Sequence, residues 1–104
     1  IGTHLENEFI ENLKKENNFH PGLKVNIPNG VKIFKYEKFE QLLKSNVDLL
    51  VLAISSKGIE WVSDHLSLIY KDKKIPELLM LTKGLSVYKN DYELLVDKLI
   101  RLLS

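Results

Sequence analysis

Two short apolar runs on either side of a helical pattern constrain the fold of this chain most. The run Leu49–Ile54 is wholly apolar without alternation, which predicts a strand buried on both faces, as at the centre of a parallel sheet. A second apolar run follows Ile75 and predicts a strand over 77–82. Between the runs, apolar residues recur at helical spacing, namely Ile59, Val62, Leu66 and Ile69. This order predicts a parallel β-α-β unit and therefore an α/β fold.

The remaining segments extend the same alternation of helices and strands. The apolar spacing predicts a helix over about residues 4–16, a loop over 17–30 and a short strand over 31–36. A compact helix should follow from Phe39 to about Ser45, and Asn90 or Asp91 should cap a last helix. Ser55 or Ser56 is the predicted N-cap of the central helix. The 104 residues are therefore expected to form one α/β domain, a mostly parallel sheet with flanking helices.

Composition excludes several classes of function. Fifteen Lys and Arg against fourteen Asp and Glu leave a formal charge of +1. The net charge of the chain therefore gives no electrostatic attraction to nucleic acid or to an anionic membrane. Cysteine is absent, which excludes disulfides and thiolate metal sites and makes the cytoplasm the expected compartment. The longest apolar run is far shorter than the roughly 20 residues that cross a bilayer, so no membrane insertion is predicted.

The three histidines lack metal-ligand spacing, and no metal site is predicted.

The two core strands both end in small polar segments that contain a lysine. Ser55-Ser56-Lys57-Gly58 follows the first strand, and Thr82-Lys83-Gly84 ends the second. Open parallel sheets bind ligands beyond the carboxyl ends of their strands, so these tips predict one crevice in which Lys83 contacts an anionic ligand. The alternative for Lys83 is a solvated lysine at a strand end. No G-x-G-x-x-G, P-loop, H-E-x-x-H or G-x-S-x-G motif is present.

The order of these segments resembles the nucleotide-binding domain of NAD-dependent glycerol-3-phosphate dehydrogenases. The chain offers Ile1-Gly2-Thr3, then Phe19-His20-Pro21-Gly22-Leu23, then Asp48–Ile54 with Ser55-Ser56, then Thr82-Lys83-Gly84-Leu85. The resemblance spans nearly the full length and implies a partial Rossmann-like domain over 1–104. It further implies an oxidoreductase of glycerophospholipid metabolism that interconverts sn-glycerol 3-phosphate and dihydroxyacetone phosphate with NAD or NADP. The expected partners are that phosphorylated substrate and the dinucleotide.

The resemblance also implies roles for individual residues. Lys83 would lie between nicotinamide and substrate, as a catalytic, substrate-binding and cofactor-binding residue. Ser55 and Gly58 would border the adenosine ribose and the nicotinamide, and Gly2 and Thr3 would lie near the adenosine ribose. Phe19 would pack near the adenine, with coverage of a core edge as the alternative. No acidic residue stands at the Gly2-Thr3 tip, so the choice between NAD and NADP stays open.

Two parts of the family pattern are not found among these residues. The first β-α-β phosphate-binding unit with its glycine-rich turn would precede Ile1, and the helical second domain would follow Ser104. We therefore expect a fragment that is inactive by itself, and a homo-oligomer that covers the unpaired edge of Leu49–Ile54. The alternatives are another two-domain hydroxy-acid or alcohol dehydrogenase, or a non-catalytic flavodoxin-like interaction or phosphotransfer module.

Overall fold

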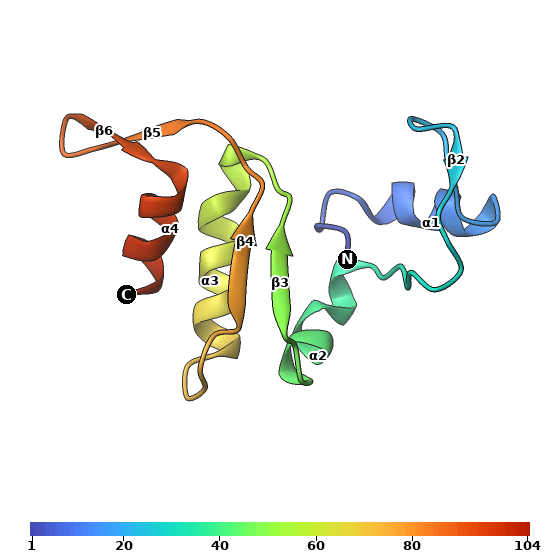
Figure 1. Ribbon diagram of the computed structural model, residues 1–104, viewed down its shortest axis with the longest axis horizontal. Coiled ribbons are helices and arrows are strands. Elements are labelled where there is room, and N and C mark those ends of the chain that lie inside the picture. The colour runs from blue at the N-terminus through green and yellow to red at the C-terminus, as the bar shows by residue number, and fades with distance from the viewer. The chain divides into compact units, whose positions relative to one another are not determined.

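A computed structural model describes all residues from Ile1 to Ser104 and confirms an α/β chain with four helices and short sheets (Figure 1). The helices are α1 (Asn7–Lys15), α2 (Phe39–Lys44), α3 (Ile59–Ile69) and α4 (Leu95–Leu103). The strands are β1 (Phe19–His20), β2 (Val25–Asn26), β3 (Leu49–Leu52), β4 (Glu77–Met80), β5 (Leu85–Tyr88) and β6 (Asp91–Leu94). They form three two-stranded sheets, β1-β2, β3-β4 and β5-β6. The chain comprises two compact units, Ile1–Leu42 and Leu43–Ser104.

In the first unit, the predicted amino-terminal helix is confirmed but is shorter than expected. Helix α1 buries Ile10 and Leu13 and ends before Asn17 and Asn18, whose φ angles of 55° and 62° break the helical path. The predicted loop over 17–30 contains the small antiparallel pair β1-β2. The two asparagines end the helix, and the turn over 21–24, in which Lys24 has a φ of 54°, reverses the chain between the two strands. A pair of two-residue strands is too short to give a periodic pattern in the sequence.

The strand predicted over 31–36 is wrong. This segment has no strand, and its backbone link to another part of the unit is a hydrogen bond from the Gly2 N–H to the Phe34 carbonyl, 2.9 Å. It then enters a 3₁₀ turn at Tyr36–Lys38. A strand is stable only where a partner satisfies its backbone groups along its length. Here Gly2 bonds to the Phe34 carbonyl, but no second strand lies alongside residues 31–36.

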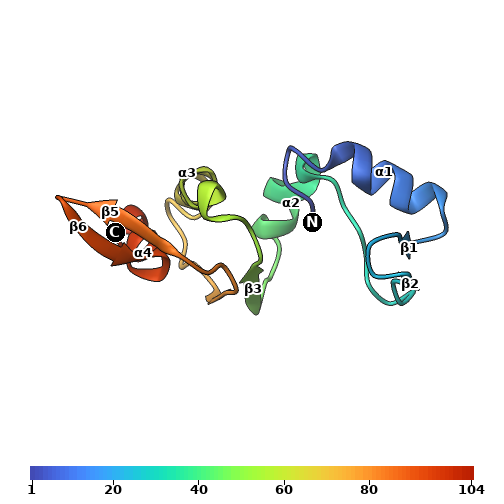
Figure 2. The ribbon, with the colours of Figure 1, turned by 90° about the horizontal axis from the view of Figure 1, so that it is seen from above.

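In the second unit, β3 and β4 form the predicted parallel pair. Leu49 is in register with Glu77, and Leu52 with Met80. Helix α3 connects the two strands and lies against one face of the pair (Figures 1 and 2). The β-α-β unit predicted from the two apolar runs is thereby confirmed, with β4 ending at Met80 instead of Thr82.

The predicted burial of the first core strand on both faces is wrong. Leu52 is buried, but Leu49 and Val51, which point to the opposite face, are 53% and 46% exposed. A mostly parallel sheet is also not observed, because β1-β2 and β5-β6 are antiparallel. A two-stranded pair with one layer of helix leaves its second face open, whatever its sequence. No strand pairs with the outer edge of β3, and assembly of copies through that edge stays a prediction.

The segment after β4 is a β-hairpin that the sequence reading missed. Strands β5 and β6 pair from Leu85↔Leu94 to Tyr88↔Asp91, and Lys89 and Asn90 form the loop with φ angles of 51° and 64°. Two positive φ angles are typical of a type I′ turn, which suits the twist of a hairpin. The predicted cap of the last helix at Asn90 or Asp91 is therefore wrong, and α4 begins at Leu95.

Helices α3 and α4 supply most of the core of the second unit. On α3 the side chains of Ile59, Val62 and Leu66 are fully buried, which confirms the helical face predicted from their spacing. On α4 the buried side chains are Leu95 and Leu99. No helix of the chain has both the length and the apolar character that crossing a membrane requires.

Candidate site at the carboxyl ends of β3 and β4

The two polar strand tips lie side by side, as predicted for a parallel pair. Beyond the last paired residues, the Leu81 N–H donates to the Leu52 carbonyl at 2.9 Å. The Thr82 hydroxyl then donates to the Ile54 carbonyl at 2.6 Å. These two bonds extend the contact between the strands past their regular ladder and hold the segments leading to Ser55 and Lys83 together.

The tip of β3 has a compact internal structure. Ser55 is exposed, and its carbonyl accepts a 2.8 Å hydrogen bond from the Gly58 N–H across the 3₁₀ turn Ser56–Gly58. The predicted side-chain cap is wrong, because neither serine caps α3 and Gly58 itself stands at the N-cap. A methyl group at Gly58 would make an ordinary van der Waals contact with the Ile54 Cβ, at 3.4 Å. The packing at this position therefore does not require glycine.

The tip of β4 carries an exposed lysine beside an open hollow. Lys83 makes no hydrogen bond or ion pair, and it borders a hollow of about 450 Å³. The other residues that line this hollow are Met80, Thr82, Gly84, Leu94, Leu95 and Val96. Gly84 has a φ of +128°, a conformation that side chains rarely adopt, and this turns the chain away from β4 into the hairpin. The site therefore offers one free ammonium group over a mainly apolar wall.

The amino terminus of α4 belongs to the same hollow through Leu95 and Val96. Its N-cap residue is Leu94, which makes no side-chain cap, so the first backbone N–H groups of the helix have no partner from a capping side chain. Such a terminus carries a partial positive charge, offset in part here by Asp97 in the first turn. Sequence reasoning missed this contribution because it placed the start of the helix at Asn90 or Asp91. The signal was the change from alternation over 85–94 to helical spacing after Leu94.

The other three predicted cofactor residues belong to the first unit. Gly2 is buried, and the Thr3 N–H donates to Glu6 Oε2 at 2.6 Å before α1 begins. Phe19 follows the other end of α1, where its N–H bonds to the Glu16 carbonyl at 3.1 Å. The Phe19 ring lines a small hollow of about 140 Å³ against α1. The structure thus separates Phe19 from Gly2 and Thr3 by the length of α1.

The histidines have local partners. His20 Nδ1 accepts the Leu23 N–H at 3.1 Å within its turn. The His65 ring lies against the Trp61 ring, with 4.4 Å between ring centroids and a tilt of 40° between their planes. No group of three or more His, Cys, Asp or Glu side chains is placed to hold a metal ion.

A larger hollow, of about 590 Å³, lies at the opposite ends of β3 and β4. Its charged lining is mixed, with the cations Lys44, Lys73 and Lys74 and the anions Asp48 and Glu77. The Tyr70 hydroxyl at its rim donates to the Leu43 carbonyl at 2.8 Å, and burial raises the pKa of Tyr70. Because lysines and carboxylates both line this hollow, it does not select for an anionic or for a cationic ligand. The Tyr70 hydroxyl already donates its hydrogen bond to the backbone.

Comparison of the chain with protein-family models and with curated proteins gives no match.

Proposed function

We propose that this chain is part of the nucleotide-binding domain of an NAD(P)-dependent dehydrogenase of the glycerol-3-phosphate dehydrogenase type, with a partial Rossmann-like fold. The observation that supports the proposal most is the hydrogen bond from Thr82 to the Ile54 carbonyl. It fixes the two polar tips at one end of a parallel pair, which is where open α/β sheets bind their ligands.

The residues present fit one end of a dinucleotide and its substrate. The hollow beside Lys83 has the volume of a small-molecule site, and Met80, Leu94 and Leu95 give it an apolar wall. A glycine-rich turn for the pyrophosphate is not among the 104 residues, so no residue is assigned to that group. When bound, the nicotinamide would supply the hydride transfer.

Lys83 would bind and orient the substrate. Its ammonium can donate hydrogen bonds to a phosphate or to a substrate oxygen on which negative charge develops. The unpaired N–H groups at the start of α4 would add a partial positive charge at the same place. Both groups favour an anionic ligand, and the neighbouring apolar side chains exclude water from one side of it.

Titration of the chain with sn-glycerol 3-phosphate, inorganic phosphate and NADH, followed by NMR chemical shifts, tests this proposal. We expect shifts at Thr82–Gly84 and at the first turn of α4. A charged hydrogen bond contributes about 1.5–3 kcal/mol, so Lys83→Met should weaken the binding of sn-glycerol 3-phosphate about tenfold or more.

The matched control is Lys57→Met, which removes the same charge from the neighbouring tip of β3. Binding that is unchanged in Lys83→Met, or weakened equally in both variants, would remove Lys83 from the site. A stronger response to a hydroxy acid such as malate than to sn-glycerol 3-phosphate would favour the alternative, another two-domain dehydrogenase.

A further inference from the structure

The β5-β6 hairpin presents a face made only of apolar side chains. Cross-strand neighbours share a face of a sheet, and the register places Leu85 beside Leu94 and Val87 beside Tyr92. These four side chains are between 54% and 75% exposed. A continuous exposed apolar face of this kind is unusual on the surface of a monomeric protein.

The opposite face of the hairpin is fixed to α4. Arg101 Nη2 donates to Glu93 Oε1 at 2.6 Å, and the Ser86 hydroxyl donates to the same oxygen at 2.9 Å. The Arg101 guanidinium also lies 3.8 Å from the centre of the Tyr88 ring, within the range of a cation-π interaction. The hairpin is thus held with its apolar face turned outward, and a partner would bind a surface that is already ordered.

We propose that the occupant of this face is the same face of a second copy of the chain. Exposed Leu, Val and Tyr side chains to this extent amount to roughly 400–500 Å² of apolar surface per copy. Two copies would therefore bury about 900 Å² through these side chains alone, and flanking residues bring the total to the roughly 1,000 Å² that a specific interface requires. The formal charge of +1 per chain causes little repulsion between copies.

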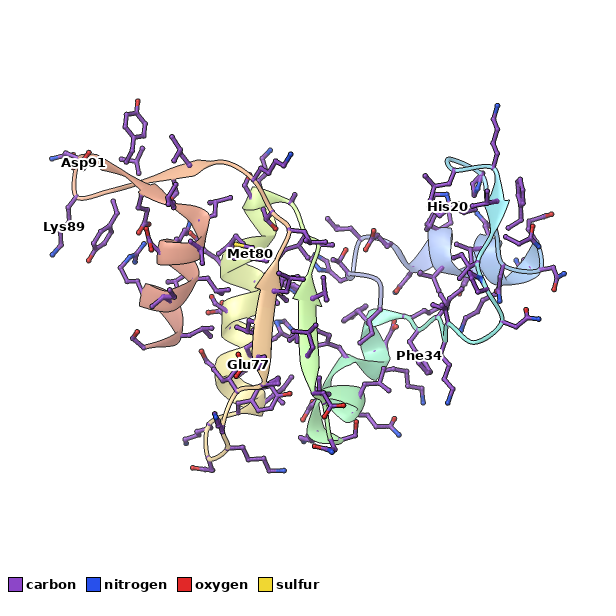
Figure 3. All side chains as sticks on the ribbon, in the orientation of Figure 1. His20, Phe34, Glu77, Met80, Lys89 and Asp91 are labelled. Carbon is purple, nitrogen blue, oxygen red and sulfur yellow. The ribbon has the colours of Figure 1, made fainter.

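The arrangement of the apolar pairs supports a second copy over another partner. Lys89 and Asp91 stand at the hairpin tip (Figure 3). Asp91 is paired with Tyr88 on the α4 side, and the Lys89 ammonium lies 5.3 Å from the centre of the Tyr88 ring, so neither charge interrupts the apolar face. A two-fold axis along the hairpin would place β5 of one copy against β6 of the other, since an isologous interface exchanges the two strands. Val87 then faces the partner's Tyr92, and Leu85 faces the partner's Leu94. One operation thus matches both apolar pairs.

Sedimentation velocity of the full chain from about 5 to 500 μM tests the proposal. We expect a reversible dimer that dissociates on dilution, because the interface is at the small end of the specific range. Val87→Lys should weaken the dimer at least tenfold, since it places two lysines within the apolar contact. Leu68→Lys, at an exposed position on α3, is the matched control and should leave the dimer unchanged. Circular dichroism of each variant confirms that it is folded.

Substitutions on the hairpin face and on the open face of β3 locate the interface. A chain that stays monomeric at 500 μM would overturn the proposal. So would a dimer that resists Val87→Lys but dissociates with Val51→Lys on the open face of β3.

Discussion

The core of the second unit can be tested by two identical substitutions on the same helix. Leu66 of α3 is fully buried, whereas Leu68 two residues later is 77% exposed. Leu66→Ala and Leu68→Ala remove the same atoms and make the same change in helix propensity. A difference in their stabilities therefore measures the burial of Leu66 directly.

The expected magnitudes follow from the loss of apolar burial. Removal of the three outer carbons of Leu66 costs about 2.4 kcal/mol at roughly 0.8 kcal/mol for each buried carbon. The cavity left in the core raises this cost, toward about 3–4 kcal/mol. A unit of roughly 60 residues has a free energy of unfolding of about 3–9 kcal/mol. Leu66→Ala should therefore remove a third or more of that stability, whereas Leu68→Ala should change it by less than about 0.5 kcal/mol.

Urea unfolding followed by circular dichroism provides the measurement, with hydrogen exchange to assign the loss to residues 43–104. Leu66→Ala should lower the urea midpoint strongly and reduce protection throughout α3 and α4. The reasoning would be refuted if the two variants unfolded at the same urea concentration, or if Leu68→Ala were the more damaging change.

Two further predictions concern the hairpin and the strand tips. The hydrogen bond from Arg101 lowers the pKa of Glu93 below its usual 4.5, so its stabilisation is complete above that value and is lost as the pH falls through the lowered pKa. Glu93→Gln should therefore melt below the wild type at pH 7 but approach it at pH 3; a constant gap in Tm would contradict this origin. Thr82→Val removes the donor to the Ile54 carbonyl, which should cost about 1 kcal/mol or roughly 4–8 °C in Tm. Thr82→Ser keeps the hydroxyl, and a greater loss with serine than with valine would assign the effect to the methyl group.

The parallel unit was predictable because its signals are local. The apolar run at Leu49–Ile54 and the helical spacing from Ile59 each specify one element, and the order strand, helix, strand favours a parallel crossover. Burial of the second face was not predictable, because it depends on which other layers cover the pair. The exposed side chains of Leu49 and Val51 have the composition of a core strand but lie outside the core.

The segments that were read wrongly depend on backbone conformations or on distant partners. Lys89-Asn90 is not the Asn-Gly or Asp-Gly pair that most often marks a type I′ turn, so the hairpin was read as a loop. The segment 31–36 has the composition of a strand, yet strand formation also requires a neighbour along its length. The predicted cap at Asn90 or Asp91 placed the start of the last helix too early, since α4 begins at Leu95. Lys83 lies three residues beyond the end of β4.

Leu94 connects the two proposals made for this chain. Its side chain belongs to the apolar face of the hairpin, and the same residue lines the hollow beside Lys83 and stands at the N-cap of α4. A second copy on the hairpin would therefore cover one wall of the hollow and reduce its contact with water, which strengthens the interaction of Lys83 with an anion. By thermodynamic reciprocity, a ligand that binds more tightly to the dimer must stabilise the dimer by the same factor. Ligand binding without any change in self-association would mean that Leu94 serves the two surfaces independently.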